Sequence, residues 1–568
     1  MGTAISIENL TFTYRNGKSP ALKSIQSHVE DGTFVVVMGH GGSGKSTLCC
    51  SLNGLVPRFF RGDYHGRVLA KGQEAAQQKA HEMSRLVGLI LQDFEAQLFS
   101  TNVELEMAFG PENHCLSRTE IERRIERYLT FVGLEKLRHR EPATLSGGQK
   151  QRLAIGSVLT LEPEILVMDE PMTDLDPQGR EEVLSLASTL QAEGRTLLIV
   201  DHEPETAANA DQVWLMKESQ MVAQGPPSEI LMNLPLMESC GVKSHPLVEL
   251  FQSMRWPGRP LTAAAACELI EKDRLMNRQE PKTSPKPYKA TRGTPILKAE
   301  GLRYIYPTYS VEALRGIDLS IQDGEFVAIL GQNGSGKTTL AKHFNGLLKP
   351  TSGHLWVQGK QTTEYRHHEL ARLVGYVFQN PDHQIFARTV YEEVGFGLKT
   401  LGESPKLIER RVEEALENVG LEGYEDRVPF ALTKGERQQV AVASVLAAQP
   451  QAIILDEPTT GLDYRHQQSM MEMLRRLNHA GHTVIIITHS TGVAAEYANR
   501  TLVIRGGLII LDGPTRSVFQ EETRLAEASL YPPALVRLSN WLGTQALTVK
   551  QMVEELVTPQ KSRSESPF

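Results

Sequence analysis

Short runs of consecutive apolar residues recur along the chain, and each is about as long as a buried β-strand. The clearest are Val35–Gly39, Glu164–Asp169, Thr196–Asp201, Phe326–Gly331, Ala452–Asp456 and Thr483–His489. Runs of this kind are typical of parallel strands that are covered on both faces. Residues 118–134 instead have helical periodicity with a charged outer face, which we interpret as a solvated helix rather than a binding patch. The alternation predicts an α/β fold with a mostly parallel sheet.

The same pattern occurs twice. The segment GHGGSGKST at Gly39–Thr47 recurs as GQNGSGKTT at Gly331–Thr339, 292 residues later. Further along, LQDFEAQLFS from Leu91 recurs as FQNPDHQIFA from Phe378, and the offset is 287 from there to His202 and His489 and 288 at Gln224 and Asp512. A period this long indicates a duplicated domain rather than a solenoid of short repeats.

The composition between the copies and at the end of the chain changes to that of a linker. Residues 277–295 are rich in Pro, Lys and Arg and almost lack apolar residues, so they cannot bury enough surface to offset the entropy of ordering. We predict a first domain with a helical extension over 1–275, a linker over 276–295, a second domain with a helical extension over 296–557, and a disordered tail over 558–568. The two extensions could pack the halves together, or they could simply complete each domain.

Overall composition excludes several classes. The chain has 568 residues, a net charge of −8 and 23% charged residues, so no global basic field recruits nucleic acid. Five cysteines have neither zinc-ligand spacing nor a disulfide pattern, which favours reduced thiols in the cytosol. We find no apolar stretch long enough to span a membrane and expect no signal peptide.

Both copies contain Gly-x-x-x-x-Gly-Lys-[Ser/Thr] between a predicted strand and a predicted helix. Glycines let backbone amides turn around phosphates, and the N-terminus of the next helix adds positive charge. The lysine reaches the β- and γ-phosphates, and the hydroxyl of Ser46 or Thr338 is a ligand for Mg²⁺. We predict nucleotide binding through Gly39, Gly41, Gly42, Ser43, Gly44, Lys45, Ser46 and Thr47, and through Gly331, Asn333, Gly334, Ser335, Gly336, Lys337, Thr338 and Thr339.

An acidic pair ends one apolar strand in each copy, Asp169–Glu170 and Asp456–Glu457. The aspartate stands where a carboxylate would hold Mg²⁺, mostly through water. The glutamate is placed to orient or activate the attacking water. A surface acidic pair is the bland alternative, but the phosphate loop upstream in both copies argues against it.

Between these elements the first copy contains Leu145-Ser146-Gly147-Gly148-Gln149. With these motifs, nearly all of both copies resembles the ATP-binding cassette (ABC) ATPases. The resemblance implies two P-loop NTPase domains, each with a helical subdomain, with ATP and Mg²⁺ as cofactors. It also implies two head-to-tail ATP sites supplied by one chain, in which Ser146, Gly147, Gly148 and Gln149 face the phosphate loop of the other copy.

The resemblance assigns further roles by position. Gln92 and Gln379 would sense Mg²⁺, His202 and His489 would contact the γ-phosphate, and Tyr14 and Tyr306 would stack on adenine, while Asp176 and Asp463 match the aspartate after the catalytic glutamate. Each tyrosine could also be an ordinary strand aromatic.

The second signature departs from the family pattern. It reads Leu432-Thr433-Lys434-Gly435-Glu436, and Gln439 stands where the first copy has Arg152. By the family's pairing, the intact signature completes the site built on Lys337 and Glu457, and the altered one completes the site built on Lys45 and Glu170. We therefore expect the two sites to hydrolyse ATP at unequal rates.

The segments around Gln92 and Gln379 resemble the Q-N-P-D-x-Q-x-F…V-x-x-[DE]-V-x-F-G stretch of energy-coupling factor (ECF) ATPases, although the first copy replaces Asn-Pro-Asp with Asp-Phe-Glu. The resemblance implies the ATPase of an importer of vitamins, cofactor precursors, cobalt or nickel. Its partners would be a transmembrane T component and a small substrate-binding membrane subunit, and it would lie on the cytoplasmic face of the cell membrane. Phe99 and Phe386 are candidates for contact with the T component, or for packing within the domain.

Three other classes are weighed against this assignment. A soluble two-cassette factor acting on ribosomes would usually carry two intact signatures and a long charged linker. A tandem sugar-importer ATPase would lack the ECF-like glutamine segment. Relatives in DNA repair would need coiled-coil or zinc insertions, for which the spacings leave no room.

Overall fold

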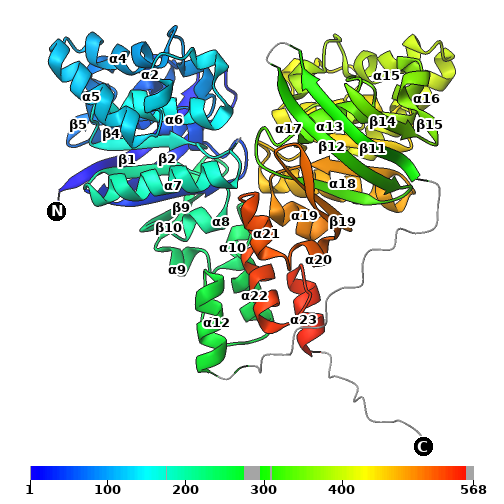
Figure 1. The fold of residues 1–568 in the computed structure, drawn as a ribbon. Helices are drawn as coiled ribbons and strands as arrows, with labels where there is room; N and C mark the ends of the chain where they lie inside the picture. Colours follow the sequence, from blue (N-terminus) through cyan, green and yellow to red (C-terminus); the bar gives the residue numbers. More distant parts are fainter. Residues whose placement is uncertain (1, 174, 274, 276–294, 308–309, 558–568) are drawn as a thin grey trace, which may run out of the picture. The chain divides into compact units, whose positions relative to one another are not determined.

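The computed structural model describes residues 2–557 except 174, 274, 276–294 and 308–309. These residues form two compact units, one made of Met1–Glu249 with Asp463–Arg465 and the other of Leu250–Leu462 with His466–Phe568. The predicted tail and all but the last residue of the predicted linker lie outside the described residues. Each unit is described by itself below (Figure 1).

Each unit contains a six-stranded sheet in which every strand but one edge strand is parallel to its neighbours, so the predicted α/β class is confirmed. The strand order is β10-β9-β3-β8-β7-β6 in the first unit and β16-β17-β18-β13-β19-β20 in the second. The bounds are β3 (Phe34–Gly39), β6 (Val87–Ile90), β7 (Ile165–Asp169), β8 (Thr196–Val200), β9 (Gln212–Lys217) and β10 (Gln220–Gly225), then β13 (Phe326–Leu330), β16 (Val374–Val377), β17 (Ala452–Asp456), β18 (Thr483–Ile487), β19 (Arg500–Arg505) and β20 (Leu508–Pro514).

The four inner strands of each of these sheets are almost wholly buried, which explains their continuous apolar sequence.

Each unit also has a four-stranded antiparallel sheet that the apolar runs did not predict. The strand orders are β2-β1-β4-β5 and β12-β11-β14-β15. Their bounds are β1 (Thr3–Tyr14), β2 (Leu22–Glu30), β4 (Gly62–Ala70), β5 (Gln73–Glu74), β11 (Pro295–Tyr306), β12 (Val311–Gln322), β14 (Ser352–Val357) and β15 (Lys360–Gln361). Because one face is buried and the other exposed, these strands alternate rather than run continuously apolar.

Helices follow the strands in the same order in both units. The first unit has α1 (Lys45–Leu52), α2 (Leu55–Arg58), α3 (Ala80–Leu86), α4 (Val103–Asn113), α5 (Arg118–Phe131), α6 (Gly147–Leu159), α7 (Pro177–Ala192) and α8 (Pro204–Ala207). The second copy has α13 (Lys337–Phe344), α14 (His367–Leu373), α15 (Val390–Thr400), α16 (Pro405–Val419), α17 (Lys434–Leu446), α18 (Tyr464–His479) and α19 (Thr491–Tyr497). We call α4–α6 the first helical subdomain and α15–α17 the second, because the three helices of each set pack on one another.

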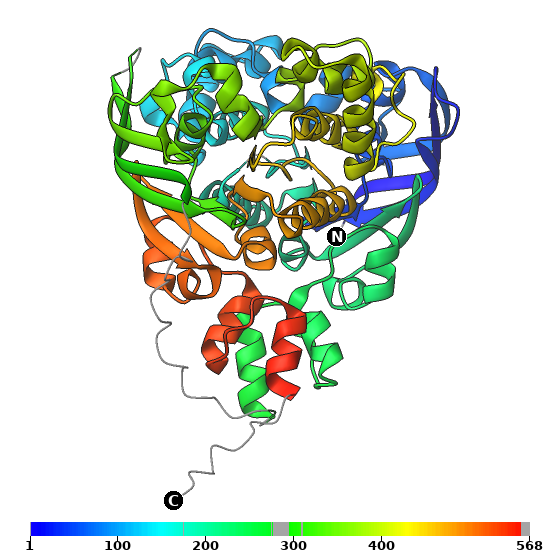
Figure 2. The same cartoon turned by 90° about the vertical axis from the view of Figure 1, so that its right-hand side faces the viewer.

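Both C-terminal extensions are helical. The first contains α9 (Pro227–Ile230), α10 (Leu234–Ser239), α11 (Pro246–Ser253) and α12 (Ala263–Lys272), and the other α20 (Thr515–Val518), α21 (Glu522–Glu527), α22 (Ala534–Leu542) and α23 (Val549–Val557). Helix α12, although it follows the first copy in sequence, belongs to the second unit and packs against α22 there (Figures 1 and 2).

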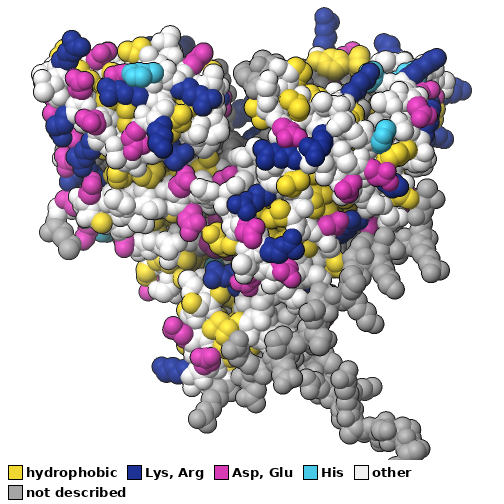
Figure 3. All heavy atoms as spheres, viewed as in Figure 1, with side chains coloured by type: hydrophobic (Ala, Val, Ile, Leu, Met, Phe, Trp, Pro, Cys, Tyr) yellow, Lys and Arg dark blue, Asp and Glu magenta, His cyan; other side chains and the backbone are white. Residues whose placement is uncertain are grey.

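The surface of the described residues fits the composition. On the face shown in Figure 3, acidic and basic side chains are interspersed over each unit. Among the helices of the described residues, none is both long enough and apolar enough to cross a membrane.

Candidate nucleotide-binding and hydrolysis sites

A tight loop joins the central strand of each sheet to a helix that begins at the motif lysine. Gly44 and Gly336 precede α1 and α13 with φ of 100° and 108°. A Cβ at either position would collide with a backbone oxygen, that of Ala21 or of Ala313. Only glycine suits these positions, and the backbone amides are thereby left to line the loop.

The lysines of both loops are buried and folded onto the loop itself. Lys45 Nζ donates to the carbonyl oxygens of Gly39 and His40, both at 2.9 Å. Lys337 Nζ donates to those of Gly331 (2.7 Å) and Gln332 (2.9 Å). Burial lowers the pKa of Lys45, although Glu170 and Asp169 nearby favour its charged form. Each ammonium is therefore centred in its loop, where a phosphate group would meet it.

A hydroxyl and a carboxylate meet beside each loop. Asp169 ends β7 and bonds the Ser46 hydroxyl, while burial raises the pKa of Asp169 to about 6. Its Oδ1 has no hydrogen-bond partner among the described residues. In the second unit, burial likewise raises the pKa of Asp456, which bonds Thr338.

The hydroxyl and carboxylate oxygens fit Mg²⁺, a hard cation that prefers oxygen. The described residues contain no cluster of three or more metal-ligating side chains, so phosphate and water oxygens would complete the coordination.

The second carboxylate has a partner that the sequence analysis missed. Tyr376 donates its hydroxyl to Asp456 Oδ2 at 2.9 Å, whereas the equivalent residue of the first copy, 287 positions earlier, is Leu89. The only sequence signal was a tyrosine in an otherwise apolar strand.

The predicted catalytic glutamates follow these aspartates with strained backbones. Glu170 has φ of 49° and Glu457 of 48°, a region that non-glycine residues rarely adopt. His202 Nε2 lies 2.8 Å from Glu170 Oε1, and His489 Nδ1 lies 3.0 Å from Glu457 Oε1. Burial would raise the pKa of each glutamate, but the histidine and the loop lysine together outweigh it and the pKa is lowered. Both carboxylates are therefore ionised near neutral pH.

The two glutamates differ at the other oxygen. Glu170 Oε2 accepts from Gln92 Nε2 at 2.8 Å and from the Thr173 hydroxyl at 3.2 Å. Glu457 Oε2 accepts from Thr460 at 3.4 Å, and the backbone of His489 also bonds this carboxylate, but no glutamine of the described residues does. Gln379 is exposed and makes no such contact in the described part of the chain. The structure thus brings Gln92 to its predicted site and leaves Gln379 apart.

The two tyrosines are held against the phosphate loops. The Tyr14 hydroxyl lies 3.0 Å from Thr47 Oγ1, and the Tyr306 hydroxyl 3.1 Å from Thr339 Oγ1. Tyr14 remains 36% exposed, so part of the residue is accessible to a ligand.

The two signatures begin helices α6 and α17 and differ in charge. In the first, Ser146 Oγ accepts from Gln149 N (3.4 Å) and Gln149 Oε1 accepts from Ser146 N (3.1 Å). In the second, Thr433 donates from both its amide and its hydroxyl to Glu436 Oε2, each at 2.8 Å.

Tyr424 also donates to Glu436 Oε1 at 2.9 Å. These hydrogen bonds outweigh burial and lower the pKa of Glu436. The altered signature thus carries its own bound carboxylate at the N-terminus of its helix.

The glutamine segments present matched aromatic pairs. The rings of Phe99 and Phe109 lie 4.6 Å apart, edge to face, and so do those of Phe386 and Phe396. Phe99 and Phe386 are both 61% exposed, so the expectation that they are surface contacts is compatible with the structure.

A buried glutamate that sequence reasoning missed fixes each of these loops. Glu106 Oε2 accepts from Phe99 N (3.1 Å) and Ser100 N (2.8 Å). Glu393 Oε2 accepts from Phe386 N (2.9 Å) and Ala387 N (2.8 Å). The signal was the acidic position of the ECF-like stretch, which is a glutamate in both copies.

The comparisons with known proteins agree with this geometry. A family model described as "ABC transporter" matches residues 22–173 and 314–460. A protein of Caldanaerobacter subterraneus, provisionally named an ABC transporter ATP-binding protein, is 49% identical over 97% of this chain and 98% of its own. One from Methanosarcina acetivorans with the same kind of name is 40% identical over 94% of this chain and 90% of its own.

Among solved structures, a protein of Clostridium perfringens described as cbiO1, part of the ABC transporter complex cbiONQ, is 37% identical. It covers 43% of this chain and 99% of its own, with a TM-score of 0.39. The family match and the relatives show that the chain belongs to the ABC transporter ATP-binding proteins, with two ATPase domains in tandem. It is an ATP-binding and ATP-hydrolysing protein.

Proposed function

We propose that the chain is the energy-coupling ATPase of an ECF-type membrane importer. It would lie on the cytoplasmic face of the membrane and bind a transmembrane T component and a small substrate-binding subunit. The cargo would be a vitamin, a cofactor precursor, cobalt or nickel. The observation that carries this proposal is the matched, exposed aromatic pair of each unit, Phe99–Phe109 and Phe386–Phe396, anchored by a buried glutamate.

Exposed aromatic pairs of this kind suit a hydrophobic partner. Edge-to-face rings present a rigid apolar ridge, and rings that keep their packing need little extra ordering when a partner helix binds. The ridge lies in the segment that begins with Gln92, and Gln92 in turn touches Glu170. A partner on the ridge is thereby linked to the ATP site by a short path.

We further propose that the two ATP sites are unequal. In the site that combines the first signature with Lys337, Asp456, Glu457 and His489, Glu457 has an oxygen able to accept a proton from water. In the site that combines Lys45, Asp169, Glu170 and His202 with the altered signature, Gln92 adds a hydrogen bond of 2.8 Å to that oxygen. The Thr173 contact there has a counterpart in Thr460. Glu436 also places a negative charge where a phosphate group would approach. The first combination should therefore hydrolyse ATP faster.

Each residue has a role in this scheme. The loop amides and Lys337 hold the β- and γ-phosphates, and Tyr306 stacks on adenine. Glu457 accepts the proton of the attacking water, and His489 keeps its carboxylate in place. Mg²⁺, held through Thr338 and Asp456, would neutralise charge on the phosphates. The sequence-based boundaries 1–275, 276–295, 296–557 and 558–568 remain our proposal for the organisation of the repeat.

The test is purification of the tagged full chain from gently solubilised native membranes, with mass spectrometry of what accompanies it. Recovery of a multi-helix membrane protein and a small substrate-binding membrane subunit would support the importer. Replacement of Phe386 and Phe396 by Ala should abolish the recovery of these membrane partners. Tyr531→Ala, also at an exposed aromatic residue, should leave their recovery unchanged. Sedimentation of the chain with ribosomes instead would favour the soluble translation-factor class.

A further inference from the structure

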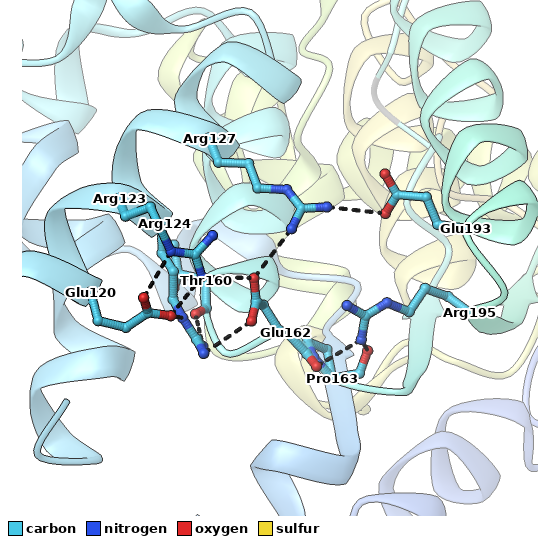
Figure 4. A network of polar contacts seen from close by, with 9 residues as sticks. All are labelled: Glu120, Arg123, Arg124, Arg127, Thr160, Glu162, Pro163, Glu193 and Arg195. Atoms are coloured by element: carbon cyan, nitrogen blue, oxygen red, sulfur yellow. Dashed lines mark hydrogen bonds and ion pairs between the residues drawn. The ribbon is translucent and has the colours of Figure 1, made fainter.

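A network of charged side chains ties the first helical subdomain to its core (Figure 4). Glu162, in the loop between α6 and β7, receives three arginines of α5: Arg124 at 3.0 Å, Arg127 at 3.4 Å and Arg123 at 3.7 Å. Arg127 also reaches Glu193 at the end of α7, at 3.5 Å.

The remaining members of the network hold its acceptors in place. Arg195, at the start of β8, donates to the carbonyl oxygens of Glu162 (2.7 Å) and Pro163. On the helix side, Glu120 bonds Arg123 and Arg124, each at 2.6 Å. Helix α5 is thus fastened to two parts of the first unit, the loop before β7 and the end of α7, and Arg195 in turn holds that loop. Connected charges of this kind contribute more than isolated surface pairs.

The second copy has a cavity at the equivalent place. It measures about 60 Å³ and is lined by Arg411, Glu414, Ala415, Asn418, Leu446, Gln449, Leu477 and His482. By the offset of 287 these correspond to Arg124, Arg127, Tyr128, Phe131, Leu159, Glu162, Leu190 and Arg195.

Two kinds of change open this junction. Tyr128 and Phe131 are replaced by the smaller Ala415 and Asn418, which removes the rings that fill the space in the first unit. Arg127 is replaced by Glu414, whose ion pairs run to Arg410 (3.6 Å) and Arg411 (3.8 Å) of the same helix. Only the hydrogen bond from Gln449, at 3.5 Å, ties Glu414 to the core among the described residues.

We propose that Arg127 and Glu162 are positioning residues that hold the first helical subdomain fixed on its core, while the second helical subdomain pivots about the cavity at Glu414. A packed, cross-linked junction resists relative movement, whereas a junction with unfilled space and charges satisfied within one helix does not. Nucleotide-driven movement would then pass mainly through the second subdomain, which carries Phe386, Phe396 and the altered signature. The inference goes beyond the proposed function and applies whether or not the partner is an importer.

The test measures distances within each unit of the full chain by electron paramagnetic resonance. Cys115 and Cys267 are first replaced by Ser, and spin labels are placed on exposed positions of matched pairs: Glu126 with Ser188, and Glu413 with Arg475. Without nucleotide, we expect a narrow distance distribution for the first pair and one about twice as broad for the second.

Variants that exchange residues between the copies decide the cause. Arg127→Glu with Glu162→Gln should broaden the first distribution, and Glu414→Arg with Gln449→Glu should narrow the second. Circular dichroism confirms that each variant is folded. The proposal would be overturned if the two distance distributions were equally wide in the unsubstituted chain. It would also be overturned if neither pair of substitutions changed the width of its distribution. Neither result depends on whether membrane partners are found.

Discussion

The side-chain amide of Gln92 donates a hydrogen bond to Oε2 of Glu170 at 2.8 Å. The glutamine to which the family resemblance assigns Mg²⁺ sensing therefore touches the glutamate placed to activate water. The second unit lacks this contact: Glu457 keeps its histidine but not its glutamine. This difference, with Glu436 and with the tyrosine on Asp456, makes the two units chemically unequal.

The first prediction concerns the two glutamates. Glu457→Gln should lower steady-state ATP hydrolysis of the full chain by about 100-fold or more, because a general base of the faster site is lost. Glu170→Gln should lower it by no more than about threefold. A phosphate-release assay with saturating Mg-ATP measures both, and equal losses would sink the asymmetry.

The second prediction tests the altered signature. Glu436→Gln installs the residue of the first copy and removes a carboxylate that Thr433 and Tyr424 hold. Turnover should rise by up to about twofold as the second site begins to contribute, and Glu170→Gln in this background should then cost about half the activity. If Glu170→Gln does not lower ATP hydrolysis in the Glu436→Gln background, Glu436 is not what limits that site.

The activity of the Glu436→Gln variant relative to the parent chain should not depend on pH near neutrality. The pKa of Glu436 is lowered because its hydrogen bonds outweigh burial. The carboxylate therefore stays charged down to a lower pH than an ordinary glutamate. The ratio of variant to parent turnover should therefore be constant from pH 6 to 8. A ratio that approaches one as the pH falls from 8 to 6 would contradict an ionised Glu436.

The third prediction concerns the anchor of the aromatic pair. Glu393→Ala leaves the amides of Phe386 and Ala387 without their buried acceptor, which costs about 1–3 kcal/mol for each unsatisfied group and loosens the loop. Recovery of the membrane partner should fall about tenfold while binding of a fluorescent ATP analogue is unchanged.

The control for this anchor is Glu392→Ala, which removes an exposed acceptor of Arg388 N at 3.2 Å. It should leave the recovery of the membrane partner intact. Similar losses for the two variants would mean that the anchor is not specific.

The fourth prediction concerns stability of the second unit. Arg500 is nearly buried, pairs with Asp512 through two bonds of 2.7 Å and reaches Glu325 at 3.0 Å. Arg500→Gln, which installs the residue found at Gln212 of the first copy, should reduce the free energy of unfolding of this unit by about 2–4 kcal/mol, since Asp512 is partly exposed.

Urea denaturation can resolve this loss by unit. Trp214 is the tryptophan of the first unit, so the other three report on the second. Arg505→Gln, in an exposed pair with Glu527, is the control and should change stability by less than about 0.5 kcal/mol. A shift confined to the Trp214 signal would contradict the assignment.

Much of the fold could be predicted from the sequence because it follows from local composition. Buried parallel strands such as β7 and β17 are continuous apolar runs, and the glycine loops before Lys45 and Lys337 admit few alternatives. The antiparallel sheets were missed because their strands are half-exposed and their pairing partners are distant in sequence.

Side-chain contacts were less accessible. Nothing in the sequence indicates that Gln92 reaches Glu170 while Gln379 stays away from Glu457, because this depends on the path of a loop. The anchors Glu106 and Glu393 and the tyrosine on Asp456 become meaningful only once their distances are known. The cavity beside Glu414 arises from several replacements that are individually unremarkable and that the fold brings together.

The packing of α12 against α22 has a consequence for how the chain can change. The last helix that follows the first copy folds as part of the second unit. The boundary of the sequence repeat therefore differs from the boundary of the folded unit. A chain severed between the copies would separate these two helices, and a substitution on one alters the surface to which the other must fit. We expect substitutions in the two extensions to be correlated during evolution, because α12 and α22 pack on each other. The rate of these substitutions would be limited by this packing rather than by the ATPase cores.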